Sequence, residues 1–149
     1  LHNVVGKLFI SLHNMKIYFA ASIRGGRQDK DLYAQIIPLL VKYGSVLTEH
    51  VASSTLTDAG ENMPSEIIYN RDMNWLKESD VVVAEVTQPS LGVGYEVAYA
   101  EMLGKKMLCI HRNGERLSAM IAGNKNIVKK RYASISDLNT IFEEFFSRM

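Results

Sequence analysis

The chain has 149 residues, of which 47% are hydrophobic, and its formal net charge at pH 7 is +1. This length is enough for one domain with a buried core. Because nucleic-acid binding depends on clustered Lys and Arg, the nearly balanced charge argues against a nucleic-acid partner, and no apolar run is long enough to span a membrane.

Residues 1–14 differ in character from the rest of the chain. They are moderately apolar, but they lack the basic region and the small-residue cleavage site of a signal peptide. We therefore expect Met15 to be the native start and residues 1–14 to be an extension. Residues 15–149 would then form the functional domain.

The single cysteine, Cys109, lies in an apolar run and predicts a buried core thiol. It has no partner for an internal disulfide and no metal-type spacing. One unpaired cysteine fits a reducing intracellular compartment, so we expect a location in the cytoplasm or the nucleus.

Strand and helix signals alternate along the rest of the chain. Short apolar runs bounded by turn residues predict five strands, at residues 16–20, 46–47, 80–85, 106–111 and 127–132. Helical spacing of apolar residues, together with capping residues, predicts five helices, at residues 32–43, 64–79, 94–103, 117–122 and 136–145.

Single residues set the expected limits of these helices. Pro38 should kink the first helix or delay its start, and Pro64 can occupy the first position of the second. Gly104 is expected to end the third helix, and Ser136 to cap the last. The polar and glycine-containing residues 49–63 predict a loop.

This order predicts an α/β fold with a single doubly wound, flavodoxin- or Rossmann-like sheet, five-stranded and parallel, with helices on both faces. Ligands of such folds bind beyond the carboxyl ends of the strands, where the strand order reverses. In a flavodoxin-like order this crevice lies between the first and third strands. The loops at residues 21–26 and 88–92 should therefore converge there.

The two converging loops carry groups that suit an anion. Ser22 and Ser90 offer hydroxyls, Arg24 offers a cation, and the glycines offer unhindered N–H groups. The dinucleotide fingerprint and the Walker A pattern are both absent, so the expected ligand is a mononucleotide or a sugar phosphate. Taken singly, Arg24 could equally be a surface residue and the glycines could be ordinary turn residues.

The sequence indicates that Glu96 lies in the first turn of a helix, behind a glycine loop that follows the third strand. A helix dipole would hold a carboxylate there in its ionised form, as a carboxylate nucleophile requires. The alternative is that Glu96 only stabilises its own helix, and for this residue taken alone that is the simpler interpretation.

Asp72 is the second candidate carboxylate. Apolar residues lie one turn before and one turn after it, so it sits on or beside the buried stripe of its helix, where a charge needs a partner or a function. The alternative is a border position from which the carboxylate reaches water. Two carboxylates beside one crevice suggest glycoside chemistry. The four histidines show no metal-ligand spacing, and only His50 could touch the crevice.

The runs at residues 18–27, 46–51 and 80–96 resemble the 2'-deoxynucleoside 5'-phosphate N-hydrolases of the nucleoside 2-deoxyribosyltransferase group. The resemblance extends from about residue 16 to residue 121, with a weaker tail to residue 149. It implies hydrolysis of the N-glycosidic bond of deoxynucleoside monophosphates, which gives a free base and 2-deoxyribose 5-phosphate. It also implies that no metal or organic cofactor is needed.

By position, the resemblance implies that Glu96 is the nucleophile that forms a deoxyribosyl-enzyme intermediate. Asp72 would help the base to depart, and Tyr18 would lie beside the reacting sugar. The substrate-binding residues that it implies around the 5'-phosphate are Ser22, Ile23, Arg24, Gly25, Ser90 and Gly92. Ser118 would reach the phosphate of the neighbouring subunit's site, with Met120 beside the base, and this implies a homodimer with composite sites.

Two other functions stay open at this point. A nucleoside 2-deoxyribosyltransferase would share the two carboxylates and pass the sugar to a second base, but it needs no phosphate-binding serines and arginine. A non-catalytic nucleotide-binding module would keep the fold without turnover, because a fold does not imply a function.

Overall fold

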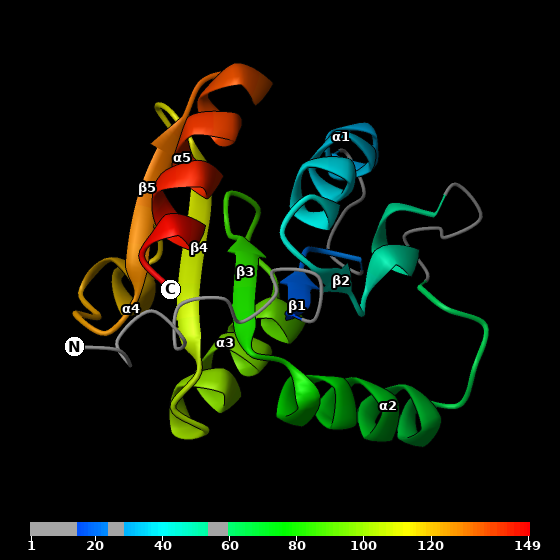
Figure 1. Cartoon of the computed structure of the whole chain (residues 1–149). Helices are drawn as coiled ribbons and strands as arrows, with labels where there is room; N and C mark the ends of the chain where they lie inside the picture. The colour runs from blue at the N-terminus through cyan, green and yellow to red at the C-terminus, as the bar shows by residue number, and fades with distance from the viewer. Residues whose placement is uncertain (1–14, 24–28, 54–59) are drawn as a thin grey trace, which may run out of the picture.

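The computed structural model describes residues 15–23, 29–53 and 60–149. Its five strands form one sheet in the order β2-β1-β3-β4-β5, and every neighbouring pair is parallel (Figure 1). The strands are β1 (Lys16–Ala20), β2 (Ser45–Val46), β3 (Val81–Glu85), β4 (Lys106–Arg112) and β5 (Val128–Tyr132). The expected doubly wound parallel sheet is confirmed. The expected extension at residues 1–14 lies outside the described residues.

The helices alternate with the strands and cover both faces of the sheet (Figure 1). They are α1 (Lys30–Val41), α2 (Ser65–Glu78), α3 (Leu91–Met102), α4 (Ala119–Ala122) and α5 (Ile135–Ser147), together with the short 3-10 helix η2 (Glu49–Ala52). Helices α1 and α5 pack on one face, and α2 and α3 pack on the other. The central strand β3 is buried along its whole length, which is typical of parallel strands with both faces covered.

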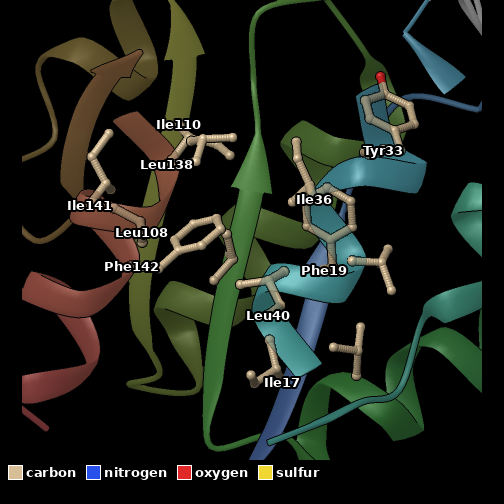
Figure 2. Close-up of a cluster of buried hydrophobic side chains, with 14 of the residues drawn as sticks. Ile17, Phe19, Tyr33, Ile36, Leu40, Leu108, Ile110, Leu138, Ile141 and Phe142 are labelled. Carbon is tan, nitrogen blue, oxygen red and sulfur yellow. The ribbon is translucent and has the colours of Figure 1, made fainter. Parts of the chain in front are cut away.

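The core between the sheet and helices α1 and α5 is built from large apolar side chains (Figure 2). Ile17 and Phe19 point into it from β1, and Leu108 and Ile110 from β4. Burying one such side chain completely contributes about 1.5–3 kcal/mol. This core anchors β1 and β3 side by side and so fixes the carboxyl edge of the sheet.

The opposite core lies under α2 and α3, because successive strand residues point to opposite faces. Tyr18 and Ala20 of β1 belong to it, together with Val97 of α3 and Leu76 of α2. Cys109 is buried in the same core, and burial raises the pKa of its thiol to about 12. The prediction of a buried core thiol is therefore confirmed.

Helix α3 begins three residues earlier than the sequence predicts, at Leu91 rather than at Gly94. The cause is Ser90, whose side-chain oxygen accepts a hydrogen bond from the backbone N–H of Val93 at 3.3 Å. This cap brings the glycines into the helix, where the sequence alone suggested a loop. Glu96 therefore lies in the second turn of α3, and the prediction of a first-turn position is wrong.

The cap of α5 also differs from the prediction, because Ser134 rather than Ser136 occupies the N-cap position. The Ser134 hydroxyl accepts from the N–H of Asp137, and the Asp137 carboxylate accepts from the N–H of Ser134. This reciprocal pair is a capping box.

In the expected loop at residues 49–63, the first residues form the 3-10 helix at Glu49–Ala52.

We expect Ser134→Ala to lower the free energy of unfolding by about 1 kcal/mol, because it removes one arm of the capping box. Ser136→Ala is the matched control, since this serine is exposed within the first turn of α5, and it should change stability by less than about 0.5 kcal/mol. Urea unfolding of both variants measures the difference. A larger loss in Ser136→Ala would contradict this cap assignment.

Candidate active site

A cavity of about 590 Å³ lies at the carboxyl edge of β1 and β3, between α2 and α3. Five of the candidate site residues line it, namely Ile23, Asp72, Ser90, Gly92 and Glu96. They come from three separate segments of the chain, and the reversal of strand order between β1 and β3 brings these segments together. Arg24 and Gly25 lie outside the described residues.

Tyr18 contacts Glu96 without lining the cavity itself. Tyr18 is buried, and its hydroxyl is hydrogen-bonded to the Glu96 side chain. Burial and the nearby charges of Glu96 and Asp72 raise the pKa of Tyr18 far above its ordinary value. A neutral tyrosine can only donate its proton to a carboxylate, so Tyr18 supports the ionised form of Glu96.

Burial opposes the ionisation of Glu96, whereas the helix dipole was expected to favour it. Burial, as the largest cause, and the charge of Asp72 together raise its pKa to about 8, against the hydrogen bond from Tyr18, which lowers it. The effect of the helix dipole fades beyond the first turn, whereas burial in an apolar surround acts on the carboxylate directly. Desolvation therefore decides the charge of this group.

Asp72 lies on α2 and faces Glu96 across the cavity. Its Oδ1 accepts a hydrogen bond from Nε of Arg71 at 2.8 Å, so the carboxylate has the partner that its place on the helix required. Burial nevertheless raises the pKa of Asp72, against the opposing influence of Arg71. Two carboxyl groups that interact in one cavity titrate as a pair, and such pairs are typical of acid–base and nucleophilic catalysis.

The mouth of the cavity is suited to an anionic group. Ser90 and Gly92 lie at the start of α3, where free backbone N–H groups favour negative charge. A Cβ on Gly92 would lie 3.9 Å from both the Ser90 hydroxyl oxygen and Oε1 of Glu96. The missing side chain therefore keeps open the space between the hydroxyl and the carboxylate.

Ser22 lies next to this space without lining the cavity itself. It follows β1 between two residues that do line the cavity, Ala21 and Ile23. Its hydroxyl oxygen is buried and has no hydrogen-bond partner in the described part of the chain. An unsatisfied buried hydroxyl is costly unless a bound group or a water satisfies it, so this position suits a ligand oxygen.

Four residues that sequence reasoning missed, or did not connect, form a network behind Asp72. The guanidinium of Arg71 donates to both carboxylate oxygens of Glu61, at 2.6 and 2.7 Å, and lies 4.7 Å from the centre of the Trp75 ring. Its Nη2 atom also lies 3.3 Å from Nε2 of His50. The only sequence signal for Arg71 was its place next to Asp72. Glu61 carried no signal, because it comes from a segment without periodicity.

His50, the one histidine that could have touched the crevice, does not line the cavity. It lies behind the wall, 3.5 Å from Glu61 and beside Trp75. Burial lowers its pKa despite the neighbouring carboxylates. Within the described ranges, no group of three or more His, Cys, Asp or Glu side chains is arranged to hold a metal ion.

Ser118 and Met120 line a second cavity, of about 600 Å³, on the other side of the β3–α3 turn. The two cavities share the wall formed by residues 89–91 and Val93. Met120 is 84% exposed and Leu91 is 97% exposed. The structure therefore does not bring Ser118 or Met120 to the Glu96 site of the same chain.

No helix in the described ranges has both the length and the apolar character needed to cross a bilayer.

Comparison of the chain with known proteins gives close matches. It is 49% identical over 140 residues to 5-hydroxymethyl-dUMP N-hydrolase of Tetraodon nigroviridis, which covers 89% of this chain and 98% of the relative. It is 56% identical over 111 residues to the protein of the same name from Rattus norvegicus, which covers 72% of this chain and 68% of the relative.

Solved structures support the fold. The CMP N-glycosidase of Clostridium botulinum superposes with a TM-score of 0.66 at 17% identity, covering 87% of this chain and 98% of the other. A 2-deoxyribosyltransferase of Bacillus psychrosaccharolyticus gives a TM-score of 0.60 at 17% identity, covering 83% and 90%. The family model for nucleoside 2-deoxyribosyltransferase matches residues 17–137. The protein therefore belongs to the nucleoside 2-deoxyribosyltransferase family.

Proposed function

We propose that the protein hydrolyses the N-glycosidic bond of 2'-deoxynucleoside 5'-monophosphates and releases a free nucleobase and 2-deoxyribose 5-phosphate. The observation that carries this function is the pair of carboxyl groups, Glu96 and Asp72, in one cavity beside an anion-suited helix start. Relatives about half identical to the chain are named as N-hydrolases of such nucleotides, among them 5-hydroxymethyl-dUMP N-hydrolase.

In the first step of the proposed reaction, an oxygen of Glu96 attacks C1' of the deoxyribose. The bond from C1' to the base nitrogen breaks, its electron pair leaves with the base, and Asp72 supplies a proton to that base. In the second step a water attacks C1' and gives its proton to Asp72, while the bond to Glu96 breaks. Both groups then return to their starting states.

The hydrogen bond from Tyr18 supports this assignment of roles. Glu96 must lose its proton before it attacks, and the buried site opposes its charge. The Tyr18 hydroxyl stabilises that charge within the cavity. Burial also raises the pKa of Asp72, and in the reactive state of the pair Glu96 is ionised while Asp72 holds the proton for the departing base.

The 5'-phosphate would bind at the start of α3. Ser90 and Gly92 line the cavity there, and the unsatisfied hydroxyl of Ser22 lies beside it. Ile23 lines the same wall, and the resemblance adds Arg24 and Gly25 to this group. A phosphate requirement favours hydrolysis of nucleotides over base exchange between nucleosides, which needs no such subsite.

The second cavity supports a homodimer with composite sites. Ser118 and Met120 lie across the β3–α3 turn from Glu96, and two apolar side chains that line this cavity, Leu91 and Met120, are 97% and 84% exposed. A hollow lined by exposed apolar side chains suits contact with a partner. In this proposal a second copy covers it and carries its own Ser118 and Met120 toward the phosphate and the base.

Incubation with 5-hydroxymethyl-dUMP should release the free base, which chromatography detects. The matching 2'-deoxynucleoside and the matching ribonucleotide should react at least about 100-fold more slowly. The deoxynucleoside lacks the phosphate that satisfies buried polar groups. The ribonucleotide carries a 2'-hydroxyl that makes the oxocarbenium-like transition state harder to reach. Base exchange between deoxynucleosides would identify a transferase instead, and tight binding without turnover of any deoxynucleotide would identify a binding module.

Glu96→Gln should abolish detectable turnover while it retains substrate binding.

The Glu96→Gln variant should also be more stable than the wild-type chain at alkaline pH. The pKa of Glu96 in the folded protein, about 8, lies above its ordinary value of 4.5, so the stability that protonated Glu96 gives is lost as the pH rises from 4.5 through 8. Glutamine removes this dependence and should gain up to about 4 kcal/mol at pH 8 and almost nothing at pH 4.

Thermal unfolding at both pH values measures this gain, with the exposed carboxylate variant Glu115→Gln as the control that should show none. A Glu96→Gln variant that turns over substrate at the wild-type rate would contradict the nucleophile assignment.

Asp72→Asn should shift the pH dependence of the remaining activity. The charge of Asp72 raises the pKa of Glu96, so its removal should lower that pKa. The rising limb of kcat/KM against pH should then move to lower pH, while the plateau falls because the acid is lost. Measurement of kcat/KM between pH 5 and pH 10 tests this, and a limb that stays in place would show that the two carboxyl groups do not interact.

A further inference from the structure

Arg71 is held on three sides by side chains from different elements. Glu61 accepts two hydrogen bonds from its guanidinium, at 2.6 and 2.7 Å. Trp75, one turn further along α2, lies under the guanidinium at 4.7 Å, and His50 of η2 lies 3.3 Å from Nη2. A two-point salt bridge combined with stacking on an aromatic ring leaves little freedom to an arginine side chain.

This fixed guanidinium also pairs with Asp72, and its Nη2 lies 2.8 Å from Oδ1 of that carboxylate. Nε of Arg71 donates to Oδ1 of Asp72 at 2.8 Å. Arg71 does not line the cavity, whereas Asp72 and Glu61 do. The arginine therefore approaches the carboxylate from behind and occupies the oxygen Oδ1. The other oxygen, Oδ2, is left for a group inside the cavity.

The negative charge of Glu61 reduces the electrostatic effect of Arg71 on Asp72. Glu61 and Arg71 are both partly buried, with side chains 12% and 21% exposed, so their pairing is only weakly screened by solvent. An isolated arginine next to an aspartate would stabilise the ionised form of that aspartate strongly. Burial is the main cause that raises the pKa of Asp72 above its ordinary value; Arg71 lowers this pKa, and the negative charge of Glu61 opposes part of the effect of Arg71.

We propose that Glu61 and Arg71 form a positioning pair, in which Glu61 fixes the guanidinium and Arg71 fixes Oδ1 of Asp72, so that Oδ2 carries the proton toward the departing base. This inference rests on the proposed function, in which Asp72 protonates the base. It assigns to Glu61 and Arg71 a role in orienting and tuning the acid, although neither touches the reacting atoms.

Charged and titratable groups face Asp72 from four other parts of the fold. These are Tyr18 on β1, His50 on η2, Glu61 in the segment before α2, and Glu96 on α3. Of these groups and Arg71, only Arg71 donates a hydrogen bond to Asp72 among the contacts of the described residues. Variants of Arg71 and Glu61 therefore separate orientation from charge. Arg71 holds the carboxylate of Asp72 in place, and Glu61 determines how strongly the positive charge of Arg71 acts on that carboxylate.

The experiment compares Arg71→Met, Arg71→Lys and Glu61→Gln with the wild-type chain. Lys77→Met is the matched control, because it also removes one positive charge from α2 at an exposed position. Steady-state kinetics give kcat and KM for 5-hydroxymethyl-dUMP. Carboxyl ¹³C NMR, assigned with Asp72→Asn, gives the pKa of Asp72 without any need for activity.

Arg71→Met should lower kcat roughly 10- to 100-fold, because a misplaced acid transfers its proton poorly, with less than about a threefold change in KM. It should also raise the pKa of Asp72. Arg71→Lys keeps the charge without the planar fork, so the pKa of Asp72 should stay close to that of the wild type while kcat stays low. Glu61→Gln should lower the pKa of Asp72, because the charge of Arg71 is no longer opposed. Lys77→Met should change none of these quantities.

A different pattern would overturn the inference. If Arg71 and Glu61 only joined two segments of the fold, their variants would lower the unfolding temperature and leave the pKa of Asp72 and the value of kcat unchanged. If the wild-type chain released no base, the proposed function would fail. The NMR titration would still decide whether the pair tunes Asp72, since an unchanged pKa in both Arg71→Met and Glu61→Gln refutes it.

Discussion

The parallel pairing of β1 with β3 is the constraint on which the site depends. Tyr18 of β1 stands in register with Val82 of β3, and β2 lies on the far side of β1. The chain must therefore leave β1 and β3 in opposite directions across the sheet. The crevice that opens at this reversal receives the start of α3 from one side and the flank of α2 from the other, and each helix brings one carboxylate.

The two carboxylates oppose the stability of the fold that holds them. Burial raises the pKa of Glu96 and of Asp72, and the charge of Asp72 raises that of Glu96 further. Burying a carboxylate that must ionise for its function lowers the free energy of unfolding, and packing elsewhere has to offset this loss. The two apolar cores on either face of the sheet provide that excess. In return, one cavity is lined by two carboxyl groups whose pKa values are both raised by burial.

Local sequence signals were sufficient for the framework but not for the contacts at the site. The apolar runs at β1, β3 and β4 gave their limits to within one residue, because buried parallel strands are nearly continuous in hydrophobicity. The start of α3 was misjudged, since glycines suggested a loop and the cap by Ser90 overrode that preference. The salt bridge between Glu61 and Arg71 spans ten residues through a segment without periodicity, so only the folded chain reveals it.

Ser90 links the chemistry of the site to the shape of the fold. Its hydroxyl oxygen accepts the N–H of Val93, and this leaves the hydroxyl hydrogen free to donate. A phosphate oxygen bound at the start of α3 would accept that hydrogen as well as the free N–H groups of the first turn. The same residue lines both cavities. A second subunit that fills the second cavity would therefore contact the turn that holds the Ser90 hydroxyl. Subunit assembly and phosphate binding would then both depend on Ser90.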